Sequence, residues 1–237
     1  ADTIKAFRVE KNLDDKYVCF WNSRNARRKQ SGTLIWWFKD FLNKVGHDKA
    51  VLIMHTDIKD GHGQDLEAII NELGLTNGEV LFSQQKVSQE DLAAMYNMAD
   101  LTINISDAEG FGLSALESLS CGTPIVATMT GGLQDQVTDG ERFFGVGIEP
   151  ASKAIIGSQD VPFIYEDRIS KEDFLDAMVK MYEMNPEDRA ELSTACRTWA
   201  TTNFGFDQFI DTWISCLRRL LMRRGPGRLE LVTLPTK

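Results

Sequence analysis

Hydrophobic and polar residues follow a regular pattern along most of this chain. Short apolar runs, the pattern of buried strands, predict five strands at residues 17–22, 50–54, 79–82, 101–105 and 124–127. Longer segments with apolar residues at every third or fourth position lie between them and predict helices at 34–45, 65–73, 89–99 and 113–119. Strand and helix in alternation predict an α/β fold, a doubly wound, Rossmann-like parallel sheet with helices on both faces.

The remaining segments complete the predicted organisation. Residues 1–16 have no clear periodicity and are expected to be an entry linker, and residues 223–237 a flexible tail. The domain therefore spans 17–222, with an extended loop near 143–169 that could be a hairpin, a lid or a surface excursion. Three helices close it, and the last has a strongly apolar face that must pack on some surface: Phe206, Phe209, Ile210, Trp213, Ile214, Leu217 and Leu220.

The stretch from Leu101 to Met129 contains the most informative chemistry. A predicted strand is followed by a turn with Gly110 and Gly112, and then by a helix. Glycine lets the backbone turn sharply and approach a ligand closely. The N-terminus of a helix offers free N–H groups and the positive end of the helix dipole, so this turn is a candidate phosphate site.

Two carboxylates frame this turn. Glu109 precedes it, and Glu117 lies about one helical turn inside the following helix. Carboxylates can accept hydrogen bonds from sugar hydroxyls, as an acidic residue does for the ribose in dinucleotide sites. A phosphate site between two such acceptors suits a nucleotide-linked sugar, whereas an ordinary βαβ crossover with packing glycines is the alternative.

Composition narrows the function classes. The formal net charge of −9 argues against nucleic acid or an anionic membrane as the main partner, leaving at most peripheral membrane contact. The chain has no long apolar run and no signal-peptide pattern. Its four cysteines are widely spaced without a CxxC pair, which favours reduced thiols and a cytoplasmic location.

The segment SDAEGFGLSALESLSCGTPIVA resembles the signature of the retaining glycosyltransferases of family 4, which have the GT-B fold. Glu109 and Glu117 match the two glutamates of that signature, and Cys121-Gly-Thr-Pro124 matches the turn that follows. The resemblance covers roughly residues 17–220 and implies the C-terminal, donor-binding half of a GT-B enzyme. The donor would be a UDP-, GDP- or ADP-sugar, with no other cofactor.

The resemblance also implies individual roles. Arg24 and Lys29, in a basic cluster after the first strand, would bind the donor diphosphate, whereas Arg27 and Arg28 match no family position and are interpreted as surface charges. The donor site would further include Val87 at the nucleobase, Glu117 at the ribose, Glu109 at the sugar, and the turn and wall residues Gly110, Phe111, Gly112, Leu113, Gly131 and Gly132. Gln134-Asp135 replaces the usual Pro-Glu, so neither receives a polar role.

Metal ions are not expected at this site. The chain has no Asp-x-Asp pair of the kind that metal-dependent transferases use to hold a cation on the diphosphate. His55, Asp57, Asp60 and His62 lie in one polar loop, which is longer than the family's usual turn. A solvated loop with turn-forming residues explains them better than a metal site does.

The leading hypothesis is therefore a glycosyltransferase donor domain that lacks its acceptor-binding N-terminal domain and is inactive without it. That domain would be in the same or another chain, and the acceptor is unknown. The alternatives are a non-catalytic nucleotide-sugar-binding module, or another GT-B enzyme such as a sugar-nucleotide epimerase or a phosphorylase. Two carboxylates could also indicate a glycoside hydrolase, but a phosphate-binding turn between them would then have no purpose.

Overall fold

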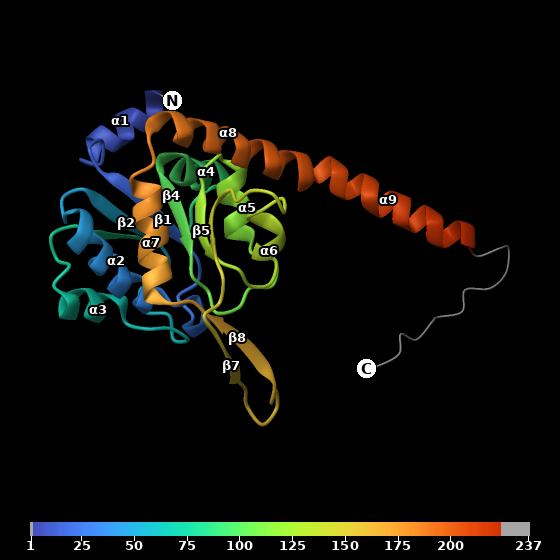
Figure 1. Cartoon of the computed structure of the whole chain (residues 1–237), viewed down its shortest axis with the longest axis horizontal. Coiled ribbons are helices and arrows are strands. Elements are labelled where there is room, and N and C mark those ends of the chain that lie inside the picture. Colours follow the sequence, from blue (N-terminus) through green and yellow to red (C-terminus); the bar gives the residue numbers. More distant parts are fainter. Residues whose placement is uncertain (1, 224–237) are drawn as a thin grey trace.

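The computed structural model describes residues 2–223 and has a six-stranded parallel sheet at its centre (Figure 1). In spatial order the strands are β3 (Val80–Ser83), β2 (Ala50–His55), β1 (Tyr17–Asn22), β4 (Leu101–Asn104), β5 (Ile125–Thr128) and β6 (Gly145–Ile148). The predicted doubly wound fold is confirmed. The direction in which successive strands are added reverses between β1 and β4, the topological switch point of the sheet.

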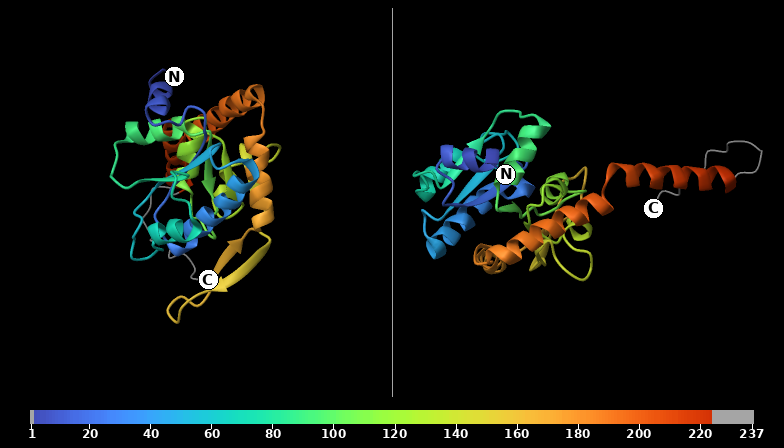
Figure 2. Two further views of the ribbon diagram at one scale, coloured as in Figure 1. Left: turned by 90° about the vertical axis from the view of Figure 1, so that its left-hand side faces the viewer. Right: turned by 90° about the horizontal axis from the view of Figure 1, so that it is seen from above.

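The helices cover both faces of this sheet. Their bounds are α1 (Asp2–Glu10), α2 (Ser31–Val45), α3 (Leu66–Leu73), α4 (Gln89–Met98), α5 (Leu113–Ser120), α6 (Leu133–Gln136), α7 (Lys171–Tyr182), α8 (Pro186–Asn203) and α9 (Phe206–Arg223), with a short 3₁₀ helix, η1 (Arg27–Lys29). Helices α2 and α7 pack together on one face, and α4, α5 and α8 cover the other (Figures 1 and 2).

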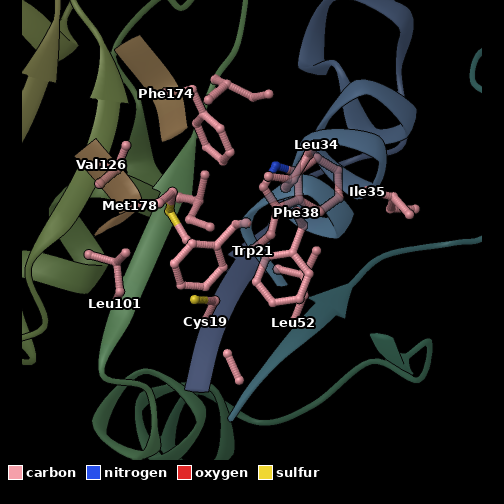
Figure 3. Packing of buried hydrophobic residues seen from close by; sticks show 14 of the residues in the cluster. Cys19, Trp21, Leu34, Ile35, Phe38, Leu52, Leu101, Val126, Phe174 and Met178 are labelled. Carbon is pink, nitrogen blue, oxygen red and sulfur yellow. The ribbon is translucent and has the colours of Figure 1, made fainter. Parts of the chain in front are cut away.

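Alternate strand residues supply the two faces of the core. On the α2–α7 side, Cys19 and Trp21 of β1 pack with Phe38 of α2 and Phe174 of α7 (Figure 3). The intervening residues Val18 and Phe20 point to the other face, toward α4. Both sides of β1 are therefore apolar, which explains why this strand reads as a nearly continuous hydrophobic run.

Local capping signals define several helix ends. Ser88 accepts a hydrogen bond from the N–H of Asp91 at 3.0 Å, and so caps α4 as its sequence position predicts. Gly74 ends α3 in the left-handed conformation with φ of 70°. Both sequence predictions are confirmed.

The first residues differ from expectation. Residues 2–10, within the segment predicted to be a linker, form α1. Arg8 fixes this helix to the domain, because its guanidinium donates to the carbonyl of Lys16 at 2.5 Å and pairs with Asp100 at 3.2 Å. Ile4 also packs against the buried cluster that contains Val18 and Phe20, but hydrophobic periodicity does not reveal the polar contacts of Arg8.

The segment 143–169 contains more regular structure than an extended loop. It begins with β6, which adds an edge strand to the sheet. An antiparallel hairpin follows, formed by β7 (Ser152–Ile156) and β8 (Ile164–Arg168). This hairpin projects away from the body of the domain (Figure 1).

Helix α9 continues beyond α8 and extends away from the sheet (Figures 1 and 2). Its predicted apolar face is present but exposed, with Phe209 56% and Leu217 50% accessible. In the described part of the chain this face is therefore not packed as expected. The predicted tail lies outside the described residues from 224 onward. Between residues 2 and 223, no helix has the length and apolar character needed to cross a membrane.

Phe174 and Phe209 allow a test of whether α7 is packed on the sheet while the apolar face of α9 is exposed. Phe174 is fully buried between α7 and the sheet, whereas Phe209 is 56% exposed. We expect Phe174→Ala to lower the free energy of unfolding by about 3–5 kcal/mol, the usual cost of removing a buried aromatic ring. Phe209→Ala should change it by less than about 0.5 kcal/mol. Urea denaturation followed by circular dichroism measures both, and a large loss in Phe209→Ala would mean that α9 is covered.

Candidate functional site

A cavity of about 430 Å³ opens at the carboxyl ends of β1 and β4, the switch point of the sheet. The two strands pair only through Cys19–Leu101 and Phe20–Thr102, so their ends are free to separate beyond those pairs. Such a crevice is where open α/β sheets bind ligands. The cavity is lined by Asn22, Ser23, Arg28, Lys29, Glu109, Gly110, Phe111, Gly112, Leu113, Ser114 and Glu117.

The glycine turn forms one wall of this cavity. Gly112 adopts φ of 85° and precedes the first residue of α5 without a side-chain cap. The first N–H groups of α5 are therefore not capped by a side chain at that position, as an anion site requires. The structure brings Gly110, Phe111, Gly112 and Leu113 to the cavity.

Gly131 and Gly132 contact the backbone of the glycine turn directly. The N–H of Gly132 donates to the carbonyl of Gly110 at 2.8 Å. A Cβ atom at Gly131 would collide with the carbonyl oxygen of Glu109, and one at Gly132 would meet that of Phe111. These glycines are thus required because two backbone segments touch. They lie behind the turn, and neither lines the cavity itself.

Glu109 lies at the floor of the cavity, and one of its two carboxylate oxygens accepts several hydrogen bonds. Its carboxylate accepts from the Lys29 ammonium, from Asn104 Nδ2 at 3.0 Å and from Ser106 Oγ at 3.0 Å. Only 6% of the Glu109 side chain and 11% of the Lys29 side chain are exposed. Asn104 and Ser106 end β4 and begin the turn, so the same strand that positions Glu109 also supplies its partners.

These contacts set the charges of the pair. Burial disfavours the charged form of Glu109, but the hydrogen bonds from Lys29, Asn104 and Ser106 outweigh it, so the pKa of Glu109 lies below its usual 4.5. Burial also lowers the pKa of Lys29, and the hydrogen bond and charge of Glu109 offset this only in part. The floor of the cavity therefore holds a carboxylate beside a poorly hydrated ammonium.

Glu117 stands on α5 between the first cavity and a second one. Its carboxylate accepts from Tyr96 Oη at 2.8 Å and lies 3.4 Å from Asn22 Nδ2. Burial, followed by the charge of Glu117, raises the pKa of Tyr96, so this phenol remains a donor. The second cavity, of about 390 Å³, lies between α4 and α5 and is lined by Gln89, Leu92, Ala93, Tyr96, Leu113, Leu116, Glu117, Ser120 and Cys121.

The basic cluster is arranged differently from its predicted use. Lys29 and Arg28 line the cavity, and Arg28 donates to the carbonyl of Ala108 at 2.5 Å and lies 3.5 Å from Glu109. Arg24 instead pairs with Asp60 at 2.6 Å and contacts His62. Arg27 and Arg28 are exposed, as surface charges are, with 56% and 44% of their side chains accessible. Each also makes a contact that this interpretation did not include, because Arg28 lines the cavity and Arg27 pairs with buried Glu166.

The polar loop and Val87 are not among the residues that line this cavity. Asp60 accepts from Arg24 and from the N–H of His62 at 2.9 Å, while His55 contacts Ser83. Among residues 2–223, no cluster of three or more His, Cys, Asp or Glu side chains is arranged to hold a metal ion. Val87, 37% exposed, precedes α4 and lies two residues from Gln89 of the second cavity.

Four residues that contact Glu109 or Glu117 were not predicted from the sequence. Asn22, Asn104 and Ser106 are polar residues at or just beyond the carboxyl ends of buried strands. That position was itself a signal, because the carboxyl ends of parallel strands share one edge of a sheet. Tyr96 could not be predicted in this way. It lies on the apolar stripe of α4, a pattern that predicts burial but not the hydrogen bond with Glu117.

The sequence profile described as "Glycosyl transferases group 1" matches residues 2–198. The chain belongs to this family. The match includes α1 and every residue of the first cavity, and it ends before α9. The prediction of a glycosyltransferase family from the Glu109–Glu117 motif is thus confirmed at the level of group 1.

Curated relatives are similar over part of the chain. A D-inositol 3-phosphate glycosyltransferase from Arthrobacter sp. (strain FB24) is 30% identical over 148 residues, covering 62% of this chain and 33% of that protein. One from Mycobacterium sp. (strain KMS) is 43% identical over 76 residues, covering 32% of this chain and 17% of that protein. The matched region is therefore a third or less of the length of these relatives.

Solved structures share the fold. Alr3699/HepE from Anabaena, in complex with UDP and glucose, superposes with a TM-score of 0.65 at 20% identity, covering 90% of this chain and 52% of that one. Sucrose-phosphate synthase from Thermosynechococcus elongatus gives 0.69 at 22% identity, covering 92% and 49%. This chain thus corresponds to about half of each neighbour.

Gly131 and Gly110 allow a direct test of the backbone contact behind the turn. Gly131 has φ of 50° and no room for a Cβ, whereas nothing lies within 4 Å of a Cβ at Gly110. We expect Gly131→Ala to lower the free energy of unfolding by about 1–3 kcal/mol, because the strain must displace the turn. Gly110→Ala should be close to neutral in urea denaturation. Equal stability of the two variants would show that the loops do not touch in solution.

The lowered pKa of Glu109 predicts a pH dependence of stability. A carboxyl group whose pKa is lower in the folded state stabilises the fold above its ordinary pKa, and this contribution is lost as pH falls through the folded value. We therefore expect the advantage of wild type over Glu109→Gln in unfolding free energy to be constant above about pH 4.5 and to shrink below it. Denaturation curves at pH 6 and pH 3.5 measure this, and a widening gap would contradict it.

Proposed function

We propose that this chain is the donor-binding half of a retaining glycosyltransferase and that the cavity at the switch point holds a nucleotide-diphosphate sugar. The observation that carries this proposal is the placement of Lys29, Arg28 and the N-terminus of α5 around one cavity whose floor is Glu109. Cations and free N–H groups are suited to a diphosphate, and the Glu109 oxygen without a close hydrogen bond is suited to accept from sugar hydroxyls.

The diphosphate would lie between η1 and the glycine turn. Arg28 and Lys29 lie in η1, which follows β1, and the N–H groups belong to the start of α5, which follows β4. Charge on the departing nucleotide would grow during transfer, and groups already in place stabilise such charge without reorganising. Arg24, which the family resemblance assigns to the diphosphate, would reach it only by leaving Asp60.

The nucleoside would extend from Glu117 into the cavity between α4 and α5. Glu117 and Leu113 line both cavities, so a ligand can pass from one to the other along α5. Glu117 would accept from the ribose hydroxyls, with Tyr96 and Asn22 holding its carboxylate. The base would lie near Gln89 and the preceding Val87, where backbone groups give little selection among bases.

The sugar would lie over Glu109, beside Asn104 and Ser106. Because its pKa is lowered, Glu109 would act as a hydrogen-bond acceptor and as a negative charge near the reacting carbon. We propose that the acceptor is held by a second domain, in the same or another chain. The retained configuration and this division of roles come from the resemblance to family 4, and the greater length of the relatives supports a second domain.

The test is calorimetric titration with nucleotide diphosphates and nucleotide sugars. UDP and UDP-glucose come first, because structures of the neighbour HepE contain them, followed by GDP, ADP and their sugar conjugates. We expect saturable binding of one series in the presence or absence of Mg²⁺, since the chain has no Asp-x-Asp pair. A chain that binds none of these ligands would contradict the proposal.

Variants assign the diphosphate contacts in the same assay. Lys29→Ala and Arg28→Ala should each weaken binding of the nucleotide diphosphate by about 1.5–3 kcal/mol, or roughly 10–150-fold, with little change for the nucleoside. Arg24→Ala is the matched control, because Arg24 lies in the same cluster but pairs with Asp60. A greater loss in Arg24→Ala than in Arg28→Ala would show that Arg24 leaves Asp60 when the ligand binds.

A further inference from the structure

The β7–β8 hairpin is joined to the site by the backbone of one residue, Asp107. The N–H of Asp167 at the base of β8 donates to the carbonyl of Asp107 at 2.7 Å, and the N–H of Asp107 donates to the carbonyl of Arg28 at 2.8 Å. Asp107 begins the turn that contains Glu109. The hairpin, the turn and η1 are therefore connected at a single point two residues from Glu109.

Side chains reinforce this connection with buried charge. Glu166 of β8 is only 2% exposed, and its carboxylate accepts from both terminal nitrogens of Arg27, with Nη1 at 2.9 Å from Oε2. Arg168 donates to the same carboxylate at 3.2 Å and lies 3.6 Å from Asp107. Asp107 also accepts from Gln30 Nε2 at 2.6 Å. Residues on either side of Arg28 and Lys29 are thus held by the hairpin and the turn.

The outer part of the hairpin has a different character. Tyr165 is 58% exposed and Phe163 72% exposed, and two strands alone are only marginally stable in water. The base, by contrast, holds a buried carboxylate that would be costly to leave unpaired. The hydrogen bond from Arg27 is the main reason that the pKa of Glu166 is lowered, which agrees with a charged pair. The bidentate pair therefore fixes the base of the hairpin on η1.

We propose that the β7–β8 hairpin is a positioning element for the diphosphate site, in which Glu166 acts through Arg27 to hold η1 with Arg28 and Lys29 facing Glu109. Arg27 does not line the cavity, but the next two residues do. A 3₁₀ helix of three residues has few hydrogen bonds of its own, so its orientation depends on outside contacts. This inference rests on the proposed function, because it assumes that the cavity takes a nucleotide diphosphate.

The experiment compares the affinities of Glu166→Gln and Arg27→Met for UDP, GDP and ADP with their affinities for the matching nucleosides. Both variants keep Arg28 and Lys29 but lose the charged pair. We expect the diphosphate that binds wild type to bind each variant about tenfold more weakly, equivalent to about 1.4 kcal/mol, while the nucleoside binds as before. Arg27→Lys, which keeps the charge without the two-pronged geometry, should recover part of the loss.

Two controls separate positioning from general damage. Asp40→Asn breaks the ion pair between Lys171 of α7 and Asp40 of α2, which is outside the site. Tyr165→Ser alters the exposed part of the hairpin and leaves its base intact. Both should bind the diphosphate like wild type. Circular dichroism and thermal unfolding would confirm that each variant is folded at the temperature of the titration.

The outcomes distinguish the two proposals. If wild type binds no diphosphate, the proposed function fails and the inference fails with it. If wild type binds and Lys29→Ala weakens binding but Glu166→Gln and Arg27→Met do not, the donor site stands and the role of the hairpin is overturned. Equal losses for diphosphate and nucleoside would also overturn it, because the hairpin would then only stabilise the domain.

Discussion

The pairing of Lys29 with Glu109 is the interaction on which the site depends. Two buried charges are expensive unless each is fully hydrogen-bonded. Here Asn104 and Ser106 supply the remaining donors to Glu109, so its charge is retained at the end of β4. The pair forms only because β1 and β4 are neighbours, which is a consequence of the strand order. The fold thus determines where opposite charges meet, and their meeting determines the chemistry of the cavity.

A steric constraint complements this electrostatic one. The turn from Glu109 to Gly112 rests directly on Gly131 and Gly132, in the loop between β5 and α6, with no side chain between them. Backbone contact leaves little freedom for the turn to move, so the N-terminus of α5 is fixed relative to Lys29. A preorganised site of this kind does not need to reorganise when a charged ligand arrives.

Sequence patterns predicted those features that depend on local periodicity or on a long motif. Strand β1 was predicted with its observed bounds, because an apolar run between polar segments leaves few alternatives. Helix α1 and the use of Arg28 could not be predicted in this way. The first depends on the contacts of Arg8 with Lys16 and Asp100, and the second on how η1 turns after β1. Both are tertiary effects that leave no periodic signal.

The exposed apolar residues on α9 and on the hairpin show that hydrophobic periodicity does not by itself predict which faces are packed. The face of α9 has the helical pattern that usually indicates burial, yet in the described residues Phe206, Trp213 and Leu217 are exposed. The hairpin has exposed aromatic residues outside, but its base is fixed by a buried carboxylate. An amphipathic pattern establishes that a face can be covered, whereas only tertiary contacts establish what covers it. For the hairpin those contacts are a backbone hydrogen bond to Asp107 and the ion pair of Glu166 with Arg27, and their position beside η1 is what lets the base of the hairpin act on the site in the proposal above.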